Sequence, residues 1–247
     1  MAKERLKIVW AGSLWMAVQY SAIHSSDPGQ RREAKAMIST PARESLNAKL
    51  SWQRLMLILA ANFRSTDLVV SLTYRDENLP KRREEAVNRV KAFIRRLREH
   101  RKSHGQRMKY VFNTEMWHSD GRVHHHFIVN STGNDYEIIR SLWARNGDNI
   151  EFSPFGTDGA ERWAKYFTKE PRVQFHRRVG EHTWHASQGM IKPVTEYRFV
   201  SDQTKLLPPP GGFILDRAEC ENCYGRFSYI MARLPETATE YKNSDLG

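Results

Sequence analysis

Residues 113–127 hold the side chains best suited to metal chemistry. Three consecutive histidines, His124, His125 and His126, follow Glu115 at a short distance, and Asp120-Gly121 stands between them. Asp-Gly between two alternating runs is a strong β-hairpin signal. A two-residue turn there pairs Glu115 with His126. Because strand side chains alternate between faces, His124 and His126 then share a face with Glu115, and His125 points to the other face.

Two imidazoles and one carboxylate on one face can chelate a divalent cation. Directly opposed Cβ atoms lie about 4.5–5.5 Å apart, and this donor set suits Mn²⁺, Zn²⁺ or Fe²⁺, or Mg²⁺ when water and phosphate complete the shell. The alternative is a strand with polar surface histidines. A three-residue loop would shift the register by one and move Glu115 to the wrong face, so the hypothesis depends on the turn. His118, beside the turn, is a further candidate ligand.

A second group of reactive side chains follows about 40 residues later, in residues 161–171. A helix there places Arg162, Tyr166 and Lys169 on one face. A tyrosine hydroxyl can attack a phosphate, and Lys165 and Lys169 supply cations for the phosphate oxygens. Tyrosine and lysine are common on helices, so this pattern gains its weight from the neighbouring histidines. Tyr74 is the one rival nucleophile, and its alternating apolar neighbours predict a core position.

The elements that must position these groups follow from apolar periodicity and turn residues. Their order predicts an α+β fold, an antiparallel sheet with helices packed on one face. The predicted helices are 40–62, 82–103, 136–144 and 158–169, and the predicted strands are 67–74, 109–115, 123–130 and 224–231. We expect three parts: a basic helical region over 1–62, the reactive domain over 63–185, and a C-terminal extension over 186–247 that packs on the core.

The composition predicts a polyanionic partner. The 247 residues carry a formal net charge of +11 and a pI near 9.8, which favours nucleic acid before an anionic membrane. The predicted helix 82–103 is one-sided in charge, and we expect it to contact phosphates unless it is only a solvated face. The candidate DNA-binding residues are Arg95, Arg96, Arg98, Lys102, Arg162 and Lys165.

Other features bound the class of protein. No apolar run approaches the roughly 20 residues of a membrane-spanning helix, and the N-terminus lacks the apolar core of a signal peptide. Two cysteines rule out a disulfide scaffold and fit a reducing compartment. Cys220 and Cys223 form a lone C-x-x-C pair, which we interpret as two reduced cysteines, with a small zinc site or a redox role as the lesser alternative.

Together these segments resemble the HUH endonucleases, the rolling-circle replication initiators and relaxases. Residues 124–126 resemble the family's His-hydrophobe-His strand, with a histidine in the middle, and Tyr166 and Lys169 match its Tyr-x-x-Lys motif. Glu115 matches an acidic third ligand. Residues 72–80 read LTYRDENLP and resemble the first motif of replication-associated proteins of microviruses and of filamentous-phage-type initiators. The resemblance covers residues 62–171. Some phage initiators carry a second tyrosine where this chain has Arg162, which favours a single-tyrosine enzyme.

The resemblance implies an HUH-type fold and tyrosine-mediated nicking and joining of single-stranded DNA. Mg²⁺ or Mn²⁺, held by Glu115, His124 and His126, would polarise the scissile phosphate. Tyr166 would form a 5′-phosphotyrosine link, with Lys169 beside the transition state. The reaction would start rolling-circle replication of a phage, plasmid or integrated element.

The same resemblance implies partners and a location. We expect single-stranded or origin hairpin DNA, a host helicase and polymerase, and no need for ATP or a membrane, in the cytoplasm of a bacterial or phage-infected cell. The alternatives are a conjugative relaxase, a non-catalytic nucleic-acid-binding protein and a metal-dependent hydrolase of small phosphorylated substrates.

Overall fold

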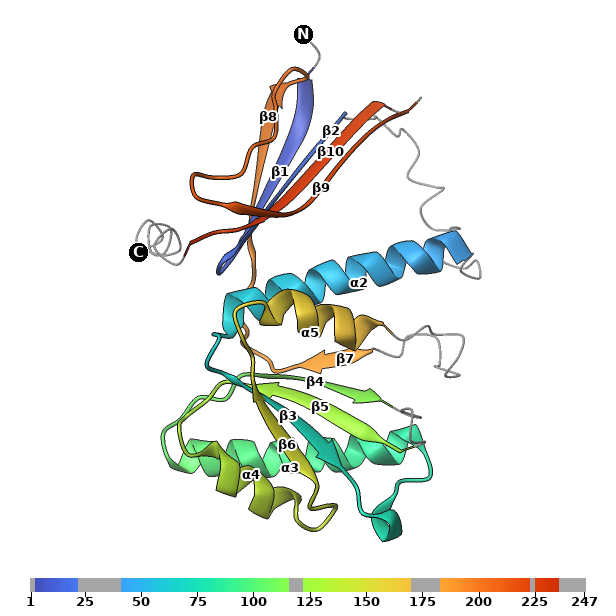
Figure 1. Cartoon of the computed structure of the whole chain (residues 1–247), viewed down its shortest axis with the longest axis vertical. Helices are drawn as coiled ribbons and strands as arrows, with labels where there is room; N and C mark the ends of the chain where they lie inside the picture. The colour runs from blue at the N-terminus through green and yellow to red at the C-terminus, as the bar shows by residue number, and fades with distance from the viewer. Residues whose placement is uncertain (1–2, 22–40, 116–121, 170–182, 223–224, 236–247) are drawn as a thin grey trace. The chain divides into compact units, whose positions relative to one another are not determined.

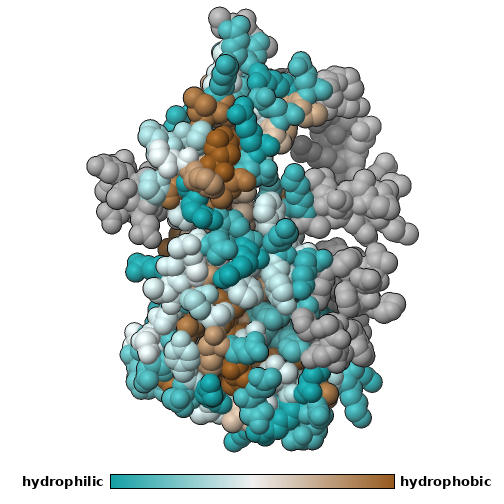
Figure 2. Space-filling view, viewed as in Figure 1, coloured by the Kyte–Doolittle hydropathy of each residue, from teal (hydrophilic) through white to brown (hydrophobic). Residues whose placement is uncertain are grey.

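The computed structural model describes residues 3–21, 41–115, 122–169, 183–222 and 225–235 (Figure 1). The chain divides into two compact units. Unit 1 combines Met1–Ala61 with Ile191–Gly247, and unit 2 is Asn62–Met190. Each unit contains a five-stranded sheet in which the paired strands are antiparallel. The side of the molecule visible in Figure 2 is mostly hydrophilic, with hydrophobic residues gathered in a few patches.

Unit 2 is built on a sheet with the strand order β6-β3-β5-β4-β7. Its strands are β3 (Leu68–Thr73), β4 (Tyr110–Glu115), β5 (His124–Val129), β6 (Ile150–Pro154) and β7 (Trp184–Ala186). Its helical segments are η1 (Asp76–Asn78), α3 (Arg83–Ser103), α4 (Asp135–Trp143) and α5 (Gly159–Thr168). The central strands β3, β5 and β4 carry the candidate site residues.

Helices α3 and α4 cover one face of this sheet. The apolar members of β3 alternate with polar ones, and the stripe of α3 recurs at helical spacing, so both elements present one continuous apolar surface. The buried cluster that results contains Leu68, Val70, Leu72, Ala86, Val90, Phe93, Ile94, Leu97, Phe112, Phe127, Val129, Ile139 and Trp143. This cluster is the core of unit 2.

Helix α5 packs on the opposite face of the sheet (Figure 1). Ala164 and Phe167 are fully buried, and the side-chain amide of Asn113 on β4 donates a hydrogen bond to the carbonyl of Phe167 at 3.5 Å. The predicted α+β class with an antiparallel sheet is confirmed. The helices α3 and α4 lie on one face as expected, and α5 adds a helix to the other.

Unit 1 is built on a sheet with the strand order β8-β1-β2-β10-β9. Its strands are β1 (Lys3–Ala11), β2 (Leu14–Ser21), β8 (Val194–Ser201), β9 (Phe213–Asn222) and β10 (Gly225–Arg233), and its helix is α2 (Pro41–Asn62). Gly12, in the turn between β1 and β2, has φ 55°, and a Cβ there would lie 2.1 Å from the Ala60 carbonyl oxygen of α2. Glycine is therefore required at this close approach.

The arrangement of unit 1 differs from the predicted division of the chain. The region 1–62 was expected to be helical, but residues 3–11 and 14–21 are strands. The region 186–247 was expected as a separate extension, but β8 pairs with β1 and β10 pairs with β2 in one sheet. Local periodicity reports only on neighbours in sequence, so it cannot show pairing between the two ends of a chain. Within the described residues, no helix is both long and apolar enough to cross a membrane.

A buried ion pair joins α3 to the start of α4. Arg101 Nη2 lies 2.5 Å from Asp135 Oδ1, and both side chains are almost fully buried. Arg101 also donates to Asn130 Oδ1 at 3.1 Å. Burial alone would raise the pKa of Asp135, but the Thr132 backbone N–H and the Arg101 guanidinium together lower it. The pair therefore stabilises the fold while Asp135 is ionised.

We predict that Asp135→Asn lowers the free energy of unfolding by about 3–5 kcal/mol at pH 7, because it leaves the buried guanidinium unpaired. The pKa of Asp135 is lowered in the folded state, so its contribution is fully present above the ordinary value of 3.8 and is lost as the pH falls through the lower folded value. The difference from the wild type should narrow accordingly in urea titrations between pH 7 and pH 3.

The matched control is Asp148→Asn, which removes a solvent-exposed ion pair with Arg75. That change should cost less than about 1 kcal/mol. Equal losses for the two variants would contradict the structural role given to Asp135.

Candidate active site

The register of the β4–β5 pair determines which histidines meet Glu115. Glu115 pairs with His124 and Asn113 pairs with His126, so Glu115 lies opposite His124 and not opposite His126 as predicted. The shift is two residues, and a shift by an even number keeps every side chain on its face. Glu115, His124 and His126 therefore share one face as predicted. The expected turn at Asp120-Gly121, with His118, lies outside the described residues.

Two hydroxyl groups on β3 hold the two histidines of this face. Ser71 pairs with His126 and Thr73 pairs with His124 across the β3–β5 ladder. Ser71 Oγ lies 3.1 Å from His126 Nδ1, and Thr73 Oγ1 lies 3.4 Å from His124 Nδ1. Each ring is thus held through Nδ1, which directs its Nε2 away from β3. A hydrogen bond to one ring nitrogen commonly orients a histidine whose other nitrogen does chemistry.

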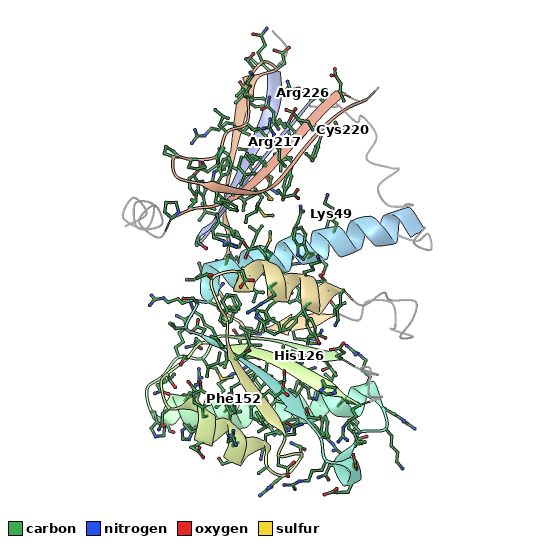
Figure 3. The ribbon with its side chains drawn as sticks, viewed as in Figure 1. Lys49, His126, Phe152, Arg217, Cys220 and Arg226 are labelled. Atoms are coloured by element: carbon green, nitrogen blue, oxygen red, sulfur yellow. The ribbon has the colours of Figure 1, made fainter. Side chains whose placement is uncertain are left out.

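The Tyr166 hydroxyl of α5 lies against the carboxylate and one imidazole. It donates to Glu115 Oε2 at 2.8 Å and lies 3.1 Å from His126 Nε2. Glu115 Oε2 and His126 Nε2 are themselves 3.0 Å apart, so the three atoms are in mutual contact. Figure 3 shows His126 on β5, at the part of the sheet that α5 covers. The structure therefore brings together residues from β4, β5 and α5.

Lys169 completes this group from the end of α5. Its Nζ lies 3.4 Å from Glu115 Oε1 and 3.7 Å from the centre of the Tyr166 ring. The Glu115 side chain is buried, whereas the Lys169 side chain is 44% exposed. The site thus joins a buried carboxylate to a cation that solvent, or a phosphate, can reach. We call Glu115, His126, Tyr166 and Lys169 the tyrosine site.

His125 lies on the opposite face of β5, as its position in the strand predicted. It is fully buried, with Nε2 at 2.7 Å from the Tyr74 hydroxyl and Nδ1 at 3.0 Å from Thr114 Oγ1. Burial lowers the pKa of His125 to about 3, and burial also raises the pKa of Tyr74. Both groups are therefore neutral core residues at pH 7, which confirms the core position predicted for Tyr74.

The three predicted metal ligands are only partly gathered. Glu115 and His126 are in contact, but in the described part of the chain no set of three His, Cys, Asp or Glu side chains is arranged to hold a metal ion. The Tyr166 hydroxyl contacts the same two atoms that would bind the metal. Metal binding by Glu115, His124 and His126 therefore stays a prediction.

The basic residues predicted on α3 lie on the other side of the sheet from the tyrosine site. Arg95 and Lys102 are exposed there. Arg96 donates to the Leu142 carbonyl of α4 at 2.9 Å, and Arg98 donates to the Tyr110 hydroxyl at 2.8 Å. These two arginines hold neighbouring elements, and a strand at Tyr166 would meet none of the four on the same face.

The basic residues predicted on α5 lie closer to the site. Arg162 donates to the Phe155 carbonyl at 3.0 Å and its guanidinium lies 5.3 Å from the Trp163 ring centre, so it supports the start of the helix. Lys165 is exposed on the same helix as Tyr166. DNA contact by either residue stays a prediction.

Sequence reasoning missed Ser71 and Thr73. A usable signal was present, because these two hydroxyl residues alternate with Val70 and Leu72 and so must share the face opposite the core. What the sequence could not supply was the pairing of β3 with β5, which sets each hydroxyl beside one histidine. Cys220 is exposed, and its expected partner Cys223 lies outside the described residues.

Residues 67–171 match the family model of the replication-associated protein ORF2 and the phage gene II protein. The matched segment contains β3 to α5, and hence every member of the tyrosine site. The match confirms the predicted resemblance to the rolling-circle replication initiators over this segment. Such a family implies DNA binding and a role in replication initiation. No curated protein and no solved structure gives a significant match to the chain.

We predict that His125→Ala lowers the free energy of unfolding by about 2–5 kcal/mol, a value typical of emptied core positions. It also removes the hydrogen-bond partner of two buried hydroxyls. The matched change His124→Ala, on the partly exposed face, should cost clearly less. Urea unfolding followed by circular dichroism measures both. The reverse order would contradict the assignment of the two faces of β5.

Proposed function

We propose that this chain is a single-tyrosine DNA-nicking and strand-transfer enzyme that initiates rolling-circle replication. One observation carries the proposal: the Tyr166 hydroxyl lies within hydrogen-bond distance of both Glu115 and His126. A tyrosine needs such neighbours to act as a nucleophile, since its hydroxyl is weak until a base accepts its proton. The family match over residues 67–171 supports the same interpretation.

In the proposed step, Tyr166 Oη attacks a DNA phosphate and a bond forms between this oxygen and phosphorus. The bond from phosphorus to the 3′-oxygen breaks, and this oxygen takes up a proton to become a free 3′-hydroxyl. Glu115 Oε2, at 2.8 Å, accepts the proton of Tyr166. The 5′-phosphate stays linked to the tyrosine, which preserves the bond energy and lets the step reverse.

Lys169 is placed to stabilise the charge that develops on the phosphate. Its ammonium group lies over the Tyr166 ring and beside Glu115, so it stays close to any phosphate that the hydroxyl attacks. Fixed cations near the developing charge are commonly the largest contribution to such reactions. Because the Lys169 side chain is partly exposed, it can change partners from Glu115 to a phosphate oxygen.

The donor set also fits a divalent metal. The Glu115 carboxylate and His126 Nε2 supply one oxygen and one nitrogen, and His124 would supply a second nitrogen. Ser71 and Thr73 hold the Nδ1 atoms of both rings, which leaves Nε2 as the ligand atom. A bound Mg²⁺ or Mn²⁺ would polarise the scissile phosphate as a Lewis acid. The Tyr166 hydroxyl shares the same carboxylate oxygen and ring nitrogen, so it competes with a metal for them.

The biological partners follow from the product. A free 3′-hydroxyl is the group that a polymerase extends, so we propose that a host polymerase and a helicase act on the nicked strand. The substrate is single-stranded DNA or the single-stranded part of an origin hairpin.

The test is a covalent protein–DNA adduct. With labelled single-stranded DNA that contains the element's origin and with Mn²⁺, denaturing electrophoresis of the wild type should show a slower labelled band. Tyr166→Phe should reduce adduct and cleavage by at least about 10³-fold, because only the attacking oxygen is lost. Tyr136→Phe, an exposed tyrosine on α4, is the matched control and should retain both.

Tyr74→Phe should also retain cleavage, since Tyr74 is a core residue. Full cleavage by Tyr166→Phe would contradict the proposed nucleophile. An adduct that forms equally with all three variants would show that a residue other than these tyrosines reacts.

Metal binding has its own test, by calorimetry with Mn²⁺ on the full chain. Glu115→Gln, His124→Ala and His126→Ala should each weaken binding by about tenfold or more, a size typical of losses at metal sites. Tyr166→Phe should not weaken it, because the hydroxyl competes for the same atoms. Unchanged affinity in all three ligand variants would remove the metal from the proposal.

A further inference from the structure

One face of the sheet in unit 1 exposes aromatic rings beside basic side chains. In the register of the sheet, Phe199 of β8 pairs with Arg5 of β1, Arg5 pairs with Tyr20 of β2, and Tyr20 pairs with Phe227 of β10. Directly paired residues point to the same face, so these four side chains form one row across four strands.

The adjoining row extends the pattern. Tyr197 pairs with Lys7, and Lys7 pairs with Val18. Phe199, Tyr197 and Phe227 are 66%, 65% and 43% exposed. We call the side chains of the two rows the aromatic face, and its members are Arg5, Lys7, Tyr20, Tyr197, Phe199 and Phe227.

These exposed rings do not continue the hydrophobic core of unit 1. The core cluster contains Leu6, Ala17 and Ile230, which lie on the opposite side of the same strands. Further along the strands, Val9 and Met231 share the side of the aromatic face and are buried. The exposure is therefore confined to one end of the sheet. Large exposed apolar side chains that gather in this way usually mark an interaction site.

The charges of the sheet are divided between its two faces. Lys3, Arg5 and Lys7 alternate along β1 on the side of the aromatic face. On the described strands, the acidic residue of this side is Asp216, which pairs with Met231 and so lies two rows away from Phe227. The other carboxylates of these strands point to the opposite side: Glu4, Glu196, Glu219 and Glu221.

The cations and the rings are also in direct contact. The Arg5 guanidinium lies 5.8 Å from the centre of the Phe199 ring. A cation held over an aromatic ring can contact a phosphate while the ring contacts a base. Proteins that bind single strands without sequence preference use this combination of a basic surface and stacking rings.

We propose that the aromatic face is a binding surface for single-stranded DNA, separate from the tyrosine site. Bases would stack on Phe199, Tyr197 and Phe227, and Arg5 and Lys7 would contact the phosphates. The row across four strands spans about 14 Å at a strand spacing of about 4.8 Å, which is about four nucleotides at 3.4 Å each. The surface lies outside residues 67–171, the segment that the family match covers.

This occupant fits better than a duplex or a second copy of the chain. The bases of a duplex are stacked on one another and leave no free face for the rings. A second copy would bring Lys3, Arg5 and Lys7 against the same three cations, which costs free energy. Only a polyanion with open aromatic surfaces matches both the charge and the rings. The inference shares its ligand class with the proposed function but does not depend on the nicking chemistry.

The test measures binding of a fluorescent 20-nucleotide oligothymidine to the full chain by anisotropy, with EDTA present so that no cleavage occurs. The double variant Phe199→Ala/Phe227→Ala should bind about tenfold or more weakly, since loss of one stacking ring alone commonly has such an effect. Phe199→Tyr/Phe227→Tyr should restore binding, because it keeps both rings. Binding to a 20-base-pair duplex should change by less than about twofold.

Two control variants separate stacking from general surface effects. Arg198→Ala removes an exposed cation on the opposite side of β8, and Leu207→Ala removes an exposed apolar side chain elsewhere in unit 1. Each should bind the oligonucleotide within about twofold of the wild type. All the substituted positions are exposed, so unchanged thermal unfolding should confirm that the variants fold.

Each other outcome overturns the inference in a recognisable way. Equal binding by the wild type and the double alanine variant, with adduct formation intact, refutes the aromatic face alone. Loss of self-association on sedimentation, with unchanged DNA affinity, would make the face an interface between copies. Failure of the wild type to bind single-stranded DNA at all would refute the proposed function together with this inference.

Discussion

The site depends on how the chain accommodates one buried carboxylate, that of Glu115. Removing a charged group from water is costly unless it is paired and hydrogen-bonded. The partners of Glu115 come from two other elements: His126 from β5, and Tyr166 and Lys169 from α5. Each of these contacts also fixes the partner in place. The same interaction therefore offsets the cost of burial, positions α5 and places the tyrosine hydroxyl beside a group that can accept its proton.

The alternation of side chains along β5 keeps this site apart from the core. His124 and His126 face the polar side, where hydroxyls of β3 hold them, and His125 faces the packed helices. Burial lowers the pKa of His125 to about 3, so this ring packs as a neutral group. Three identical residues in sequence thus meet three different environments. A residue inserted into the strand would exchange them and would remove both the site and part of the core.

Much of unit 2 could be predicted from the sequence, because its elements carry strong local patterns. The stripe of α3 and the alternation of β3 each define one buried face, and the order of elements leaves few ways to join them. The site was predicted through strand parity, although the pairing of Glu115 was two residues off. An even error leaves the faces unchanged, which is why the convergence survived. The hydroxyls of β3 were missed because they depend on which strand is the neighbour of β5.

Unit 1 was the part that local patterns could not supply. Its sheet joins β1 and β2 to β8 and β10, from the opposite end of the chain. The strands of this sheet have one side in the core and part of the other side buried as well, which blurs the two-residue alternation. A face such as that of Phe199 and Arg5 becomes visible only when the register across four strands is known. Long-range pairing, and not local propensity, therefore limits what the sequence can reveal here.

The central claim is that the hydroxyl of residue 166 is the group that bonds to DNA. The most direct measurement is peptide mapping by mass spectrometry of the adduct that the wild type forms with single-stranded origin DNA. After nuclease and protease digestion, we expect the nucleotide mass on one peptide, with fragment ions that place it on Tyr166. A nucleotide on any other tyrosine, on Ser71 or on a histidine would contradict the account.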